Sequence, residues 1–429
     1  MGDASTSSRV GWRAAVSSVM SSRLHVIASL LALAACVHGA ASPTQPADDV
    51  PRVVGYVASW GVRSKGTRLA ELPGDRLTHV IYAFARIAPN GRLALGDRCL
   101  DLGECAARSG QGGVAAGGNF AQLRILKDRH PQIKLLMAVG GWTGSGRFSD
   151  VALTPDSRRV FVASAIDVVI RRQPGLFDGI DVDWEYPVSG GLAANARRPE
   201  DRRNFTLLLE ELRRQLDAQG ARDGRRYLLT AATAAGPSHV ANLELDRVAA
   251  LVDWINVMTY DYHAGSRVAH FNAPLYAPAG DPTPHLNVDA TVRLYRDAGV
   301  PPRKIVVGVP FYGRSYGQVP SANRGLFQPA GGPVPGEWGA GELDYDVLTR
   351  KRPEANGFRR FWHPDARVPW LYKESVGIWI TYDDVQSIGQ KADYARTRGL
   401  GGVMAWELGG DDDGTLVRTI HARLNAGTR

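Results

Sequence analysis

Three carboxylates alternate with apolar residues in one short segment, and their spacing could support acid–base chemistry. Asp181, Asp183 and Glu185 are separated by Val182 and Trp184. Because successive side chains of a β-strand point to opposite faces, the three acids would share one face at intervals of about 7 Å. Neighbouring carboxylates in a partly dry site do not all ionise near neutral pH, so at least one of them keeps its proton. The pattern therefore predicts a general acid beside two further carboxylates.

The surroundings of this segment favour acid–base chemistry over metal binding. Asp178 has the opposite parity, so we expect it to support the start of the strand. A divalent metal site is the competing interpretation, but apart from Asp261 the ends of the other strands predicted below offer no clear cluster of histidines or carboxylates. The ten histidines include no His-x-x-x-His pair with a glutamate between them. We therefore predict that the protein uses neither a metal nor a cofactor.

The elements that must position these acids form a repeating pattern. From Pro51 onward, short apolar segments alternate with amphipathic stretches, as expected for βα units whose parallel strands are buried on both faces. Helices are predicted at Ser157–Arg172, Pro199–Gln219 and Asp383–Arg398. Eight strands in this order predict an α/β fold, a (β/α)8 TIM barrel, in which the carboxyl ends of the strands carry the chemistry. The predicted strands are Arg52–Ala58, Leu77–Phe84, Ile133–Val139, Phe177–Trp184, Tyr227–Thr233, Asp253–Thr259, Lys304–Pro310 and Gly401–Trp406.

The interval between the seventh and eighth strands is too long for a simple crossover. Residues 316–376 contain turn signals and aromatic residues but no single clear helix, which indicates an inserted subdomain. The barrel with this insertion is predicted to span residues 51–429.

Six segments resemble one enzyme family, in the order in which its strands follow one another. Asp178-x-x-Asp181-x-Asp183-x-Glu185 resembles the signature of glycoside hydrolase family 18, the chitinases and their relatives, in its bacterial form. The other five segments are Tyr56-Val-Ala-Ser-Trp60, Gly140-Gly141-Trp142, Met258-Thr-Tyr260-Asp261, Pro310-Phe-Tyr312-Gly-Arg314 and Met404-Ala-Trp406-Glu407. The resemblance covers residues 51–425, and the insertion resembles the small α+β domain of the deep-groove subgroup.

This resemblance implies a retaining hydrolase of β-1,4 bonds between N-acetylglucosamine units, in which the substrate's own 2-acetamido group is the nucleophile. Glu185 would protonate the glycosidic oxygen, and Asp183 would accept the amide N–H and offset the positive charge of the oxazolinium intermediate. Asp181 would take part in the proton balance, and Tyr260 would hold the acetamido oxygen for attack. The implied substrate is chitin or chitooligosaccharides.

The resemblance also implies a sugar-binding cleft lined by aromatic side chains. Trp406 would form the floor beneath the distorted sugar at subsite −1, because an indole face packs well against the C–H face of a pyranose. Trp60 and Trp142 would extend this surface, whereas Trp184 and Trp254 are expected to pack in the core. The remaining residues implied to bind substrate are Tyr56, Gly141, Met258, Asp261, Tyr312 and Arg314.

Two other functions stay open on the same fold. An endo-β-N-acetylglucosaminidase acting on glycans is disfavoured because the insertion and the tryptophans suit a long linear chain. A non-catalytic chitin-binding lectin is disfavoured because such proteins typically lose the acid that Glu185 would supply. Nucleic acid is excluded as a partner: 51 Lys and Arg against 43 Asp and Glu give a net charge of +8, but no run of five basic residues occurs. We expect a monomer.

The N-terminal residues predict export. Val26–Ala35 is an apolar run of ten residues, which is too short to cross a bilayer core of about 30 Å but typical of a signal peptide. We predict a signal peptide at residues 1–41 and a linker at residues 42–50. Leu33-Ala34-Ala35-Cys36 resembles a lipobox. The chain is therefore expected to be secreted or, if Cys36 is lipidated, to be an outer-membrane or periplasmic lipoprotein, with no transmembrane span.

Two further cysteines lie close together in the sequence. In an exported chain, Cys99 and Cys105 favour a disulfide that closes a short loop over metal or thiol chemistry. Three cysteines in 429 residues are too few to form the main framework of the fold.

Overall fold

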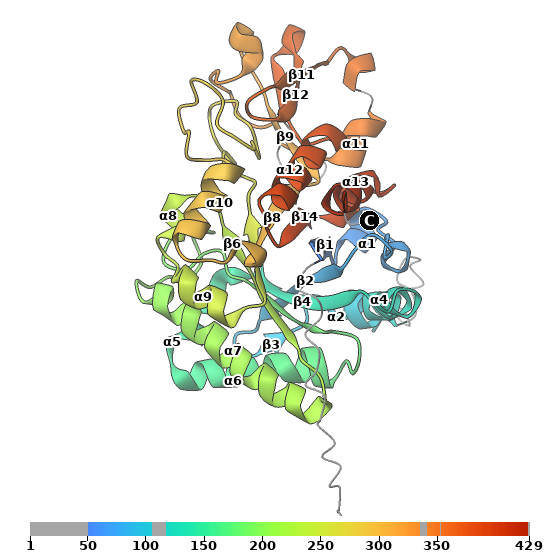
Figure 1. Ribbon diagram of the computed structural model, residues 1–429, viewed down its shortest axis with the longest axis vertical. Coiled ribbons are helices and arrows are strands. Elements are labelled where there is room, and N and C mark those ends of the chain that lie inside the picture. The colour runs from blue at the N-terminus through green and yellow to red at the C-terminus, as the bar shows by residue number, and fades with distance from the viewer. Residues whose placement is uncertain (1–49, 105–116, 335–340, 352, 428–429) are drawn as a thin grey trace, which may run out of the picture. The chain divides into compact units, whose positions relative to one another are not determined.

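Eight parallel strands close into a barrel, which confirms the predicted α/β fold (Figure 1). The structure is a computed structural model that describes residues 50–104, 117–334, 341–351 and 353–427. Strand β1 pairs in parallel with both β2 and β14, and this double pairing closes the sheet. In barrel order the strands are β1 (Arg52–Ala58), β2 (His79–Ile87), β4 (Lys134–Gly140), β5 (Gly179–Asp183), β6 (Leu228–Ala234), β7 (Trp254–Met258), β8 (Ile305–Pro310) and β14 (Gly402–Trp406), and the short β3 (Leu93–Ala94) pairs with β2.

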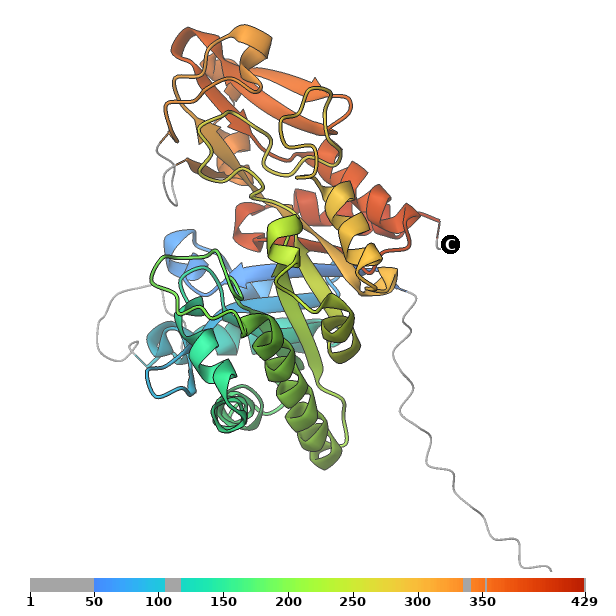
Figure 2. The ribbon, with the colours of Figure 1, turned by 90° about the vertical axis from the view of Figure 1, so that its left-hand side faces the viewer.

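Helices cover the outside of the barrel (Figures 1 and 2). The predicted helix Ser157–Arg172 starts two residues early, because Thr154 and Ser157 cap α6 reciprocally and Pro155 suits its first turn. Within the described ranges, none of the helices combines the length and apolar composition needed to cross a membrane. The helices are α1 (Gly61–Ser64), α2 (Arg98–Leu102), α4 (Gly118–Arg129), α5 (Phe148–Leu153), α6 (Pro155–Ile166), α7 (Asp201–Asp223), α8 (Pro237–Val240), α9 (Leu245–Leu251), α10 (Val288–Asp297), α12 (Val385–Thr397) and α13 (Thr415–Leu424).

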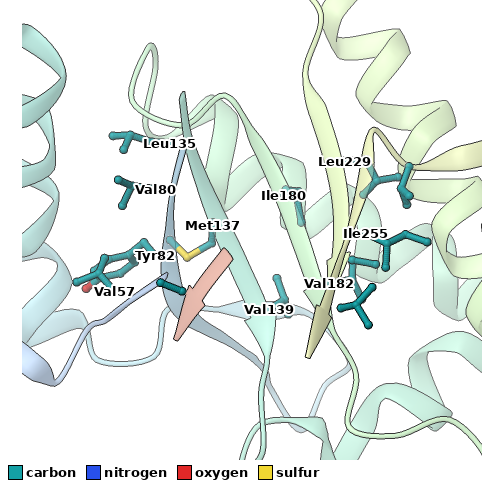
Figure 3. Close-up of a cluster of buried hydrophobic side chains, with 14 of the residues drawn as sticks. Val57, Val80, Tyr82, Leu135, Met137, Val139, Ile180, Val182, Leu229 and Ile255 are labelled. Carbon is teal, nitrogen blue, oxygen red and sulfur yellow. The ribbon is translucent and has the colours of Figure 1, made fainter. Parts of the chain in front are cut away.

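Strand alternation separates the two sides of the barrel wall. Ile180 and Val182 of β5 belong to the hydrophobic core between strands and helices, together with Met137 of β4 (Figure 3). The alternate residues of β5, Asp181 and Asp183, are buried on the inner side. The period of two therefore places these acids inside the barrel, as predicted.

Asp178 lies on the outer side, just before β5. Its carboxylate accepts hydrogen bonds from Lys127 Nζ at 2.6 Å and from the Leu135 N–H at 2.8 Å, and it also pairs with Arg225. These contacts join α4, β4 and the segment before β6 to the start of β5. Asp178 thus supports the strand, as its parity predicts.

Five antiparallel strands form the inserted sheet, drawn in orange in Figures 1 and 2. The sheet begins at Tyr312 and ends at Thr381, so the predicted range 316–376 is too narrow. Only Phe311 separates β8 from β9. Pro310 and Gly313 are residue types common in turns, but here both lie in strands, so the sheet begins earlier than predicted. The order is β10-β9-β13-β12-β11. The elements are β9 (Tyr312–Tyr316), β10 (Glu342–Asp344), α11 (Tyr345–Arg350), β11 (Arg359–His363), β12 (Val368–Lys373) and β13 (Ile378–Thr381).

The segment between β7 and α10 also belongs to the core of the insertion, although no pattern in the sequence predicts this contact. Phe271 lies 5.7 Å from Trp370 and 5.8 Å from Trp379 between ring centroids. Ala269 is buried in the same hydrophobic cluster. Residues from two separate stretches of chain therefore build one small core above the barrel strands.

Candidate active site

The three predicted acids form a row that rises toward the carboxyl ends of the barrel strands. Asp181 and Asp183 belong to β5, and Glu185 follows the end of this strand by two residues. The residues are 0 %, 4 % and 8 % exposed in this order, so burial decreases toward the carboxyl end of β5. Burial of a carboxyl group disfavours its charged form and raises its pKa.

Asp181 is held by hydrogen bonds from three other strands. Its carboxylate accepts from Tyr56 Oη at 2.7 Å, Thr230 Oγ1 at 2.5 Å and Asn256 Nδ2 at 3.4 Å. Burial raises the pKa of Asp181 to about 6, although these hydrogen bonds act in the opposite direction. Tyr56, predicted to shape the sugar pocket, therefore lies at the base of the acidic row.

Asp183 lies between the other two acids. Burial is the main cause that holds its pKa well above the usual range, followed by the negative charges of Glu185 and Asp181. The Oδ1 atom of Asp183 is buried and has no hydrogen-bond partner among the described residues. A buried polar atom without a partner is costly, so this oxygen marks a position where a ligand could supply a donor.

The backbone of Glu185 is fixed on both sides. Its N–H donates to Ser145 Oγ at 2.9 Å, and Asn195 Nδ2 donates to its carbonyl oxygen at 3.0 Å. Burial raises the pKa of the Glu185 carboxyl to about 7, a hydrogen bond with Tyr186 lowers it, and the negative charge of Asp261 raises it. A carboxyl group with this pKa keeps a proton to donate near neutral pH.

Aromatic rings lie close to the acids, because Tyr56, which donates to Asp181, is 5.7 Å from Trp406 between ring centroids. Phe84 stacks with Trp406 at 5.7 Å between ring centroids and with Trp60 at 6.3 Å. Trp142 lies 6.5 Å from Tyr186. Trp60 is 42 % exposed and Trp142 is 50 % exposed, which leaves ring surface open to a sugar. The structure thus brings Trp60 and Trp406 together through Phe84, while Trp142 lies beside Tyr186, the residue that follows Glu185.

Other predicted residues have packing roles. Trp184 and Trp254 are buried, as predicted. Gly141 has a φ of +76°, and a Cβ atom there would lie 2.5 Å from the Phe84 ring. Its N–H donates to the Asp183 carbonyl oxygen at 2.9 Å. Glycine is therefore required for the close approach of β4 to β5 and to the aromatic floor, and contact of Gly141 with substrate stays a prediction.

Asp261, Tyr312 and Arg314 form one hydrogen-bonded group. Tyr312 Oη donates to Asp261 at 2.6 Å, and Arg314 donates to both carboxylate oxygens of Asp261 at 2.7 and 2.6 Å. Arg314 also pairs with Glu342 of β10 at 2.9 Å. The inserted sheet therefore contributes residues of two strands, β9 and β10, to the group around Asp261. The negative charge of Asp261 is one of the causes that raise the pKa of Glu185.

Tyr260 and Met258 lie at the end of β7, next to this group. The Tyr260 ring is 6.3 Å from that of Tyr312, and among the described residues its hydroxyl has only the weak acceptor Met404 Sδ, at 4.0 Å. Burial raises the pKa of Tyr260, and the charges of Tyr312 and Asp183 act in the same direction, so its hydroxyl stays a donor. Met258 packs against the inner core of the barrel. A donor without a strong partner fits the role predicted for Tyr260.

Two further predictions concern metal ligands and cysteines. Within the described ranges, no three His, Cys, Asp or Glu side chains are arranged to hold a metal ion. Cys99 is disulfide-bonded. Cys105, Cys36 and the predicted signal peptide lie outside the described residues, so the pairing of Cys99 with Cys105 stays a prediction.

Comparison with known proteins decides the family. The model for glycosyl hydrolases family 18 matches residues 52–411. The chain belongs to glycoside hydrolase family 18. Its fold and family are those that the sequence motifs predict, whereas the roles of single residues stay predictions.

Relatives within family 18 include bacterial and fungal chitinases. The chain is 42 % identical over 422 residues to chitinase A1 of Niallia circulans, an alignment that covers 90 % of this chain but 60 % of that protein. It is 34 % identical over 423 residues to endochitinase 1 of Metarhizium robertsii, covering 95 % of this chain and 94 % of that protein. Among solved structures, chitinase ChiA74 from Bacillus thuringiensis has a TM-score of 0.81 and 35 % sequence identity, covering 88 % of this chain and 70 % of that one.

Several contributors to this family 18 site are absent from the predicted residues, among them Thr230, Asn256 and Asn195, which hold Asp181 and Glu185. Phe84 ends a predicted strand and Tyr186 directly follows the acid, so their positions alone could have indicated them. No motif marks Ser145 or Glu342. Both reach the site only through folding, Ser145 from the segment after β4 and Glu342 from the insertion.

Proposed function

We propose that this family 18 protein is a retaining chitinase, which hydrolyses β-1,4 bonds between N-acetylglucosamine units with the help of the substrate's own acetamido group. The buried, unpartnered Oδ1 atom of Asp183 beside Glu185 carries this proposal. A substrate amide N–H would donate the missing hydrogen bond to Asp183 Oδ1. Such a donor requires an acetamido group on the reacting sugar. The names of the relatives, chitinase A1 and endochitinase 1, support the same substrate class.

The reaction proceeds in two displacements at the anomeric carbon. Glu185 donates its proton to the glycosidic oxygen as the bond between this oxygen and the anomeric carbon breaks. The acetamido carbonyl oxygen forms the new bond, and Asp183 accepts the N–H of the resulting oxazolinium ion and offsets its positive charge. Water then attacks the anomeric carbon, the bond from this carbon to the acetamido oxygen breaks, and Glu185 takes a proton from the water, so the acetamido group is restored and two inversions retain the β configuration.

A long linear chain suits the aromatic surface better than a branched glycan. Trp60 and Trp142 are both exposed but belong to different ring contacts, one with Phe84 and one with Tyr186. A chain could therefore stack at more than one point along its length. This arrangement favours chitin over the glycan substrate of an endo-β-N-acetylglucosaminidase.

Partially acetylated glucosamine oligomers test the proposed nucleophile. We expect cleavage only where the sugar that donates its anomeric carbon is acetylated, new reducing ends that are initially β, and inhibition by a thiazoline analogue of the oxazolinium ion. Glucosamine at the new reducing ends as often as N-acetylglucosamine, or an initial α-anomer by NMR, would contradict the proposal. Binding of acetylated oligomers without any cleavage would support the lectin instead.

A further inference from the structure

A buried lysine joins the barrel to the insertion at a point that the proposed mechanism does not use. Lys65 Nζ lies 2.8 Å from Asp344 Oδ1 and 2.7 Å from Glu407 Oε1. The side chains of Lys65, Asp344 and Glu407 are 9 %, 9 % and 7 % exposed, and we call this group the Lys65 bridge. Because one ammonium group separates two buried carboxylates, its loss would leave two like charges facing each other.

On the barrel side, the Lys65 bridge adjoins Trp406, whose ring stacks with Phe84. Glu407 directly follows Trp406 at the end of β14. The second carboxylate oxygen of Glu407 accepts hydrogen bonds from the N–H groups of Ala58 at 3.3 Å and Gly409 at 3.1 Å. These contacts fix the Glu407 carboxylate to the end of β1 and to the 3-10 turn Leu408–Gly410 that follows β14. Glu407 is therefore the barrel-side anchor of the Lys65 bridge.

On the insertion side, Asp344 lies on the strand that braces the Asp261 group. In the antiparallel pair of β10 and β9, Asp344 is opposite Tyr312 and Glu342 is opposite Arg314. Tyr312 and Arg314 are the residues that hold the Asp261 carboxylate. A displacement of β10 would therefore be transmitted to Asp261.

We propose that Lys65 is a positioning residue, which sets the distance between the Asp261 group and the Trp406 floor by holding β10 against the end of β14. The inference rests on the proposed function, because only a substrate that contacts both surfaces would respond to their separation.

A second cation repeats this arrangement near the surface. Arg350 lies 2.5 Å from Asp346 of the insertion and 2.9 Å from Asp412, which follows β14. The Arg350 side chain is 60 % exposed, and exposed ion pairs contribute little to stability. The buried Lys65 bridge is therefore the stronger link, while Arg350 remains as a second attachment when Lys65 is replaced.

A cavity beside the bridge makes replacement of Lys65 compatible with folding. The cavity has a volume of about 220 Å³ and is lined in part by Lys65, Thr67, Leu408 and Gly409. Water in this space can solvate the two carboxylates in Lys65→Met. The larger guanidinium group of Lys65→Arg has room there and retains the charge.

Steady-state kinetics with the N-acetylglucosamine hexamer test the proposal. We expect Lys65→Met to raise KM about tenfold or more with kcat within about threefold of wild type, because binding contacts change, whereas burial, the largest cause of the raised pKa of Glu185, does not. Lys65→Arg should restore KM to within about threefold. Lys127→Met is the matched control, since Lys127 pairs with the buried Asp178 at 2.6 Å at the other end of the barrel. It should lower Tm and leave KM unchanged.

Amide hydrogen exchange of β10 gives a readout that does not depend on catalysis. Residues 342–344 should exchange at least about fivefold faster in Lys65→Met than in wild type or Lys127→Met. Unchanged KM and exchange in Lys65→Met, or equal changes in both methionine variants, would overturn the proposal. A wild-type protein that cleaves no oligomer would refute the proposed function instead, and the exchange comparison would still decide the role of Lys65.

Discussion

Burial governs the protonation of the three acids more than any single partner does. It is the largest cause of the raised pKa values of Asp181, Asp183 and Glu185. Asp181 has three hydrogen-bond donors, whereas Asp183 has a carboxyl group on each side and an unpartnered oxygen. Because neighbouring carboxyl groups titrate as a pair, Asp183 and Glu185 are expected to share a proton near neutral pH.

Replacing Glu185 with glutamine should remove the transferable proton and keep the size of the side chain. We expect hydrolysis of chitooligosaccharides by Glu185→Gln to fall at least about 100-fold, while oligomer binding persists. Chromatography of the products and tryptophan fluorescence titration measure the two effects. Residual activity within a few-fold of wild type would contradict the assignment of Glu185 as the acid.

The activity of the wild-type protein should decline as the pH rises through about 7. Glu185 must be protonated to donate, and burial raises its pKa to about 7. The reactive form is therefore lost above this pH, which produces the basic limb of kcat/KM. Initial rates with the tetramer from about pH 4 to 9 locate this limb, and a rate that stays constant across the range would contradict the role of the raised pKa.

The same pKa shift predicts a dependence of stability on pH. A carboxyl group with a raised folded-state pKa contributes stability that is present below its unfolded-state pKa, about 4.5, and is lost as the pH rises through its folded-state pKa, about 7 for Glu185. The Tm of Glu185→Gln should therefore exceed that of wild type by a few degrees near pH 8 and by less near pH 4. Melting curves at both pH values measure this, and an equal difference at both would argue against it.

The barrel strands are predictable from the sequence because each is buried on both faces and forms an apolar run. Strand β1 has its predicted range, Arg52–Ala58, and β5 lies within the predicted range Phe177–Trp184. Alternation along β5 also suffices to place Asp181 and Asp183 on the inner face. Local pattern therefore determines both the barrel and the acidic row.

Contacts between distant segments determine the borders of the insertion and the remaining residues of the site. Phe271 lies between β7 and α10, yet it packs with Trp370 and Trp379 in the core of the insertion. Glu342 matters only because Arg314 reaches it from the neighbouring strand. Neither residue has a local pattern that indicates its partner, which is why the borders of the insertion and part of the site could not be predicted.

Asp178 should matter for the attachment of β5 and not for catalysis. Asp178→Ala leaves the Leu135 N–H without its acceptor and removes the carboxylate that pairs with Lys127, which keeps its bond to the Leu176 carbonyl oxygen, so we expect the free energy of unfolding to fall by about 2–3 kcal/mol. Urea unfolding measures the loss. Asp217→Ala, which removes an exposed partner of Arg213, is the control and should cost less than about 1 kcal/mol. A change in the pH profile of Asp178→Ala would contradict a purely structural role.

We propose that the mature protein is exported without residues 1–41 or, if it is lipidated, begins at Cys36. Intact mass measured on exported protein should match one of these two N-termini. It should rise by about 2 Da on reduction, because Cys99 is disulfide-bonded and Cys105 is its predicted partner. A mass that includes residues 1–41, or two free thiols before reduction, would contradict the corresponding part of the proposal.

The direct passage from β8 into β9 limits how the insertion can vary among related proteins. Only Phe311 separates the two strands, and β9 carries both Tyr312 and Arg314. A recombination event that exchanged the insertion would also exchange the partners of Asp261, which comes from the loop after β7. A chimaera with an exchanged insertion would therefore keep the Asp261 group only if the incoming β9 supplied a tyrosine and an arginine at the positions of Tyr312 and Arg314.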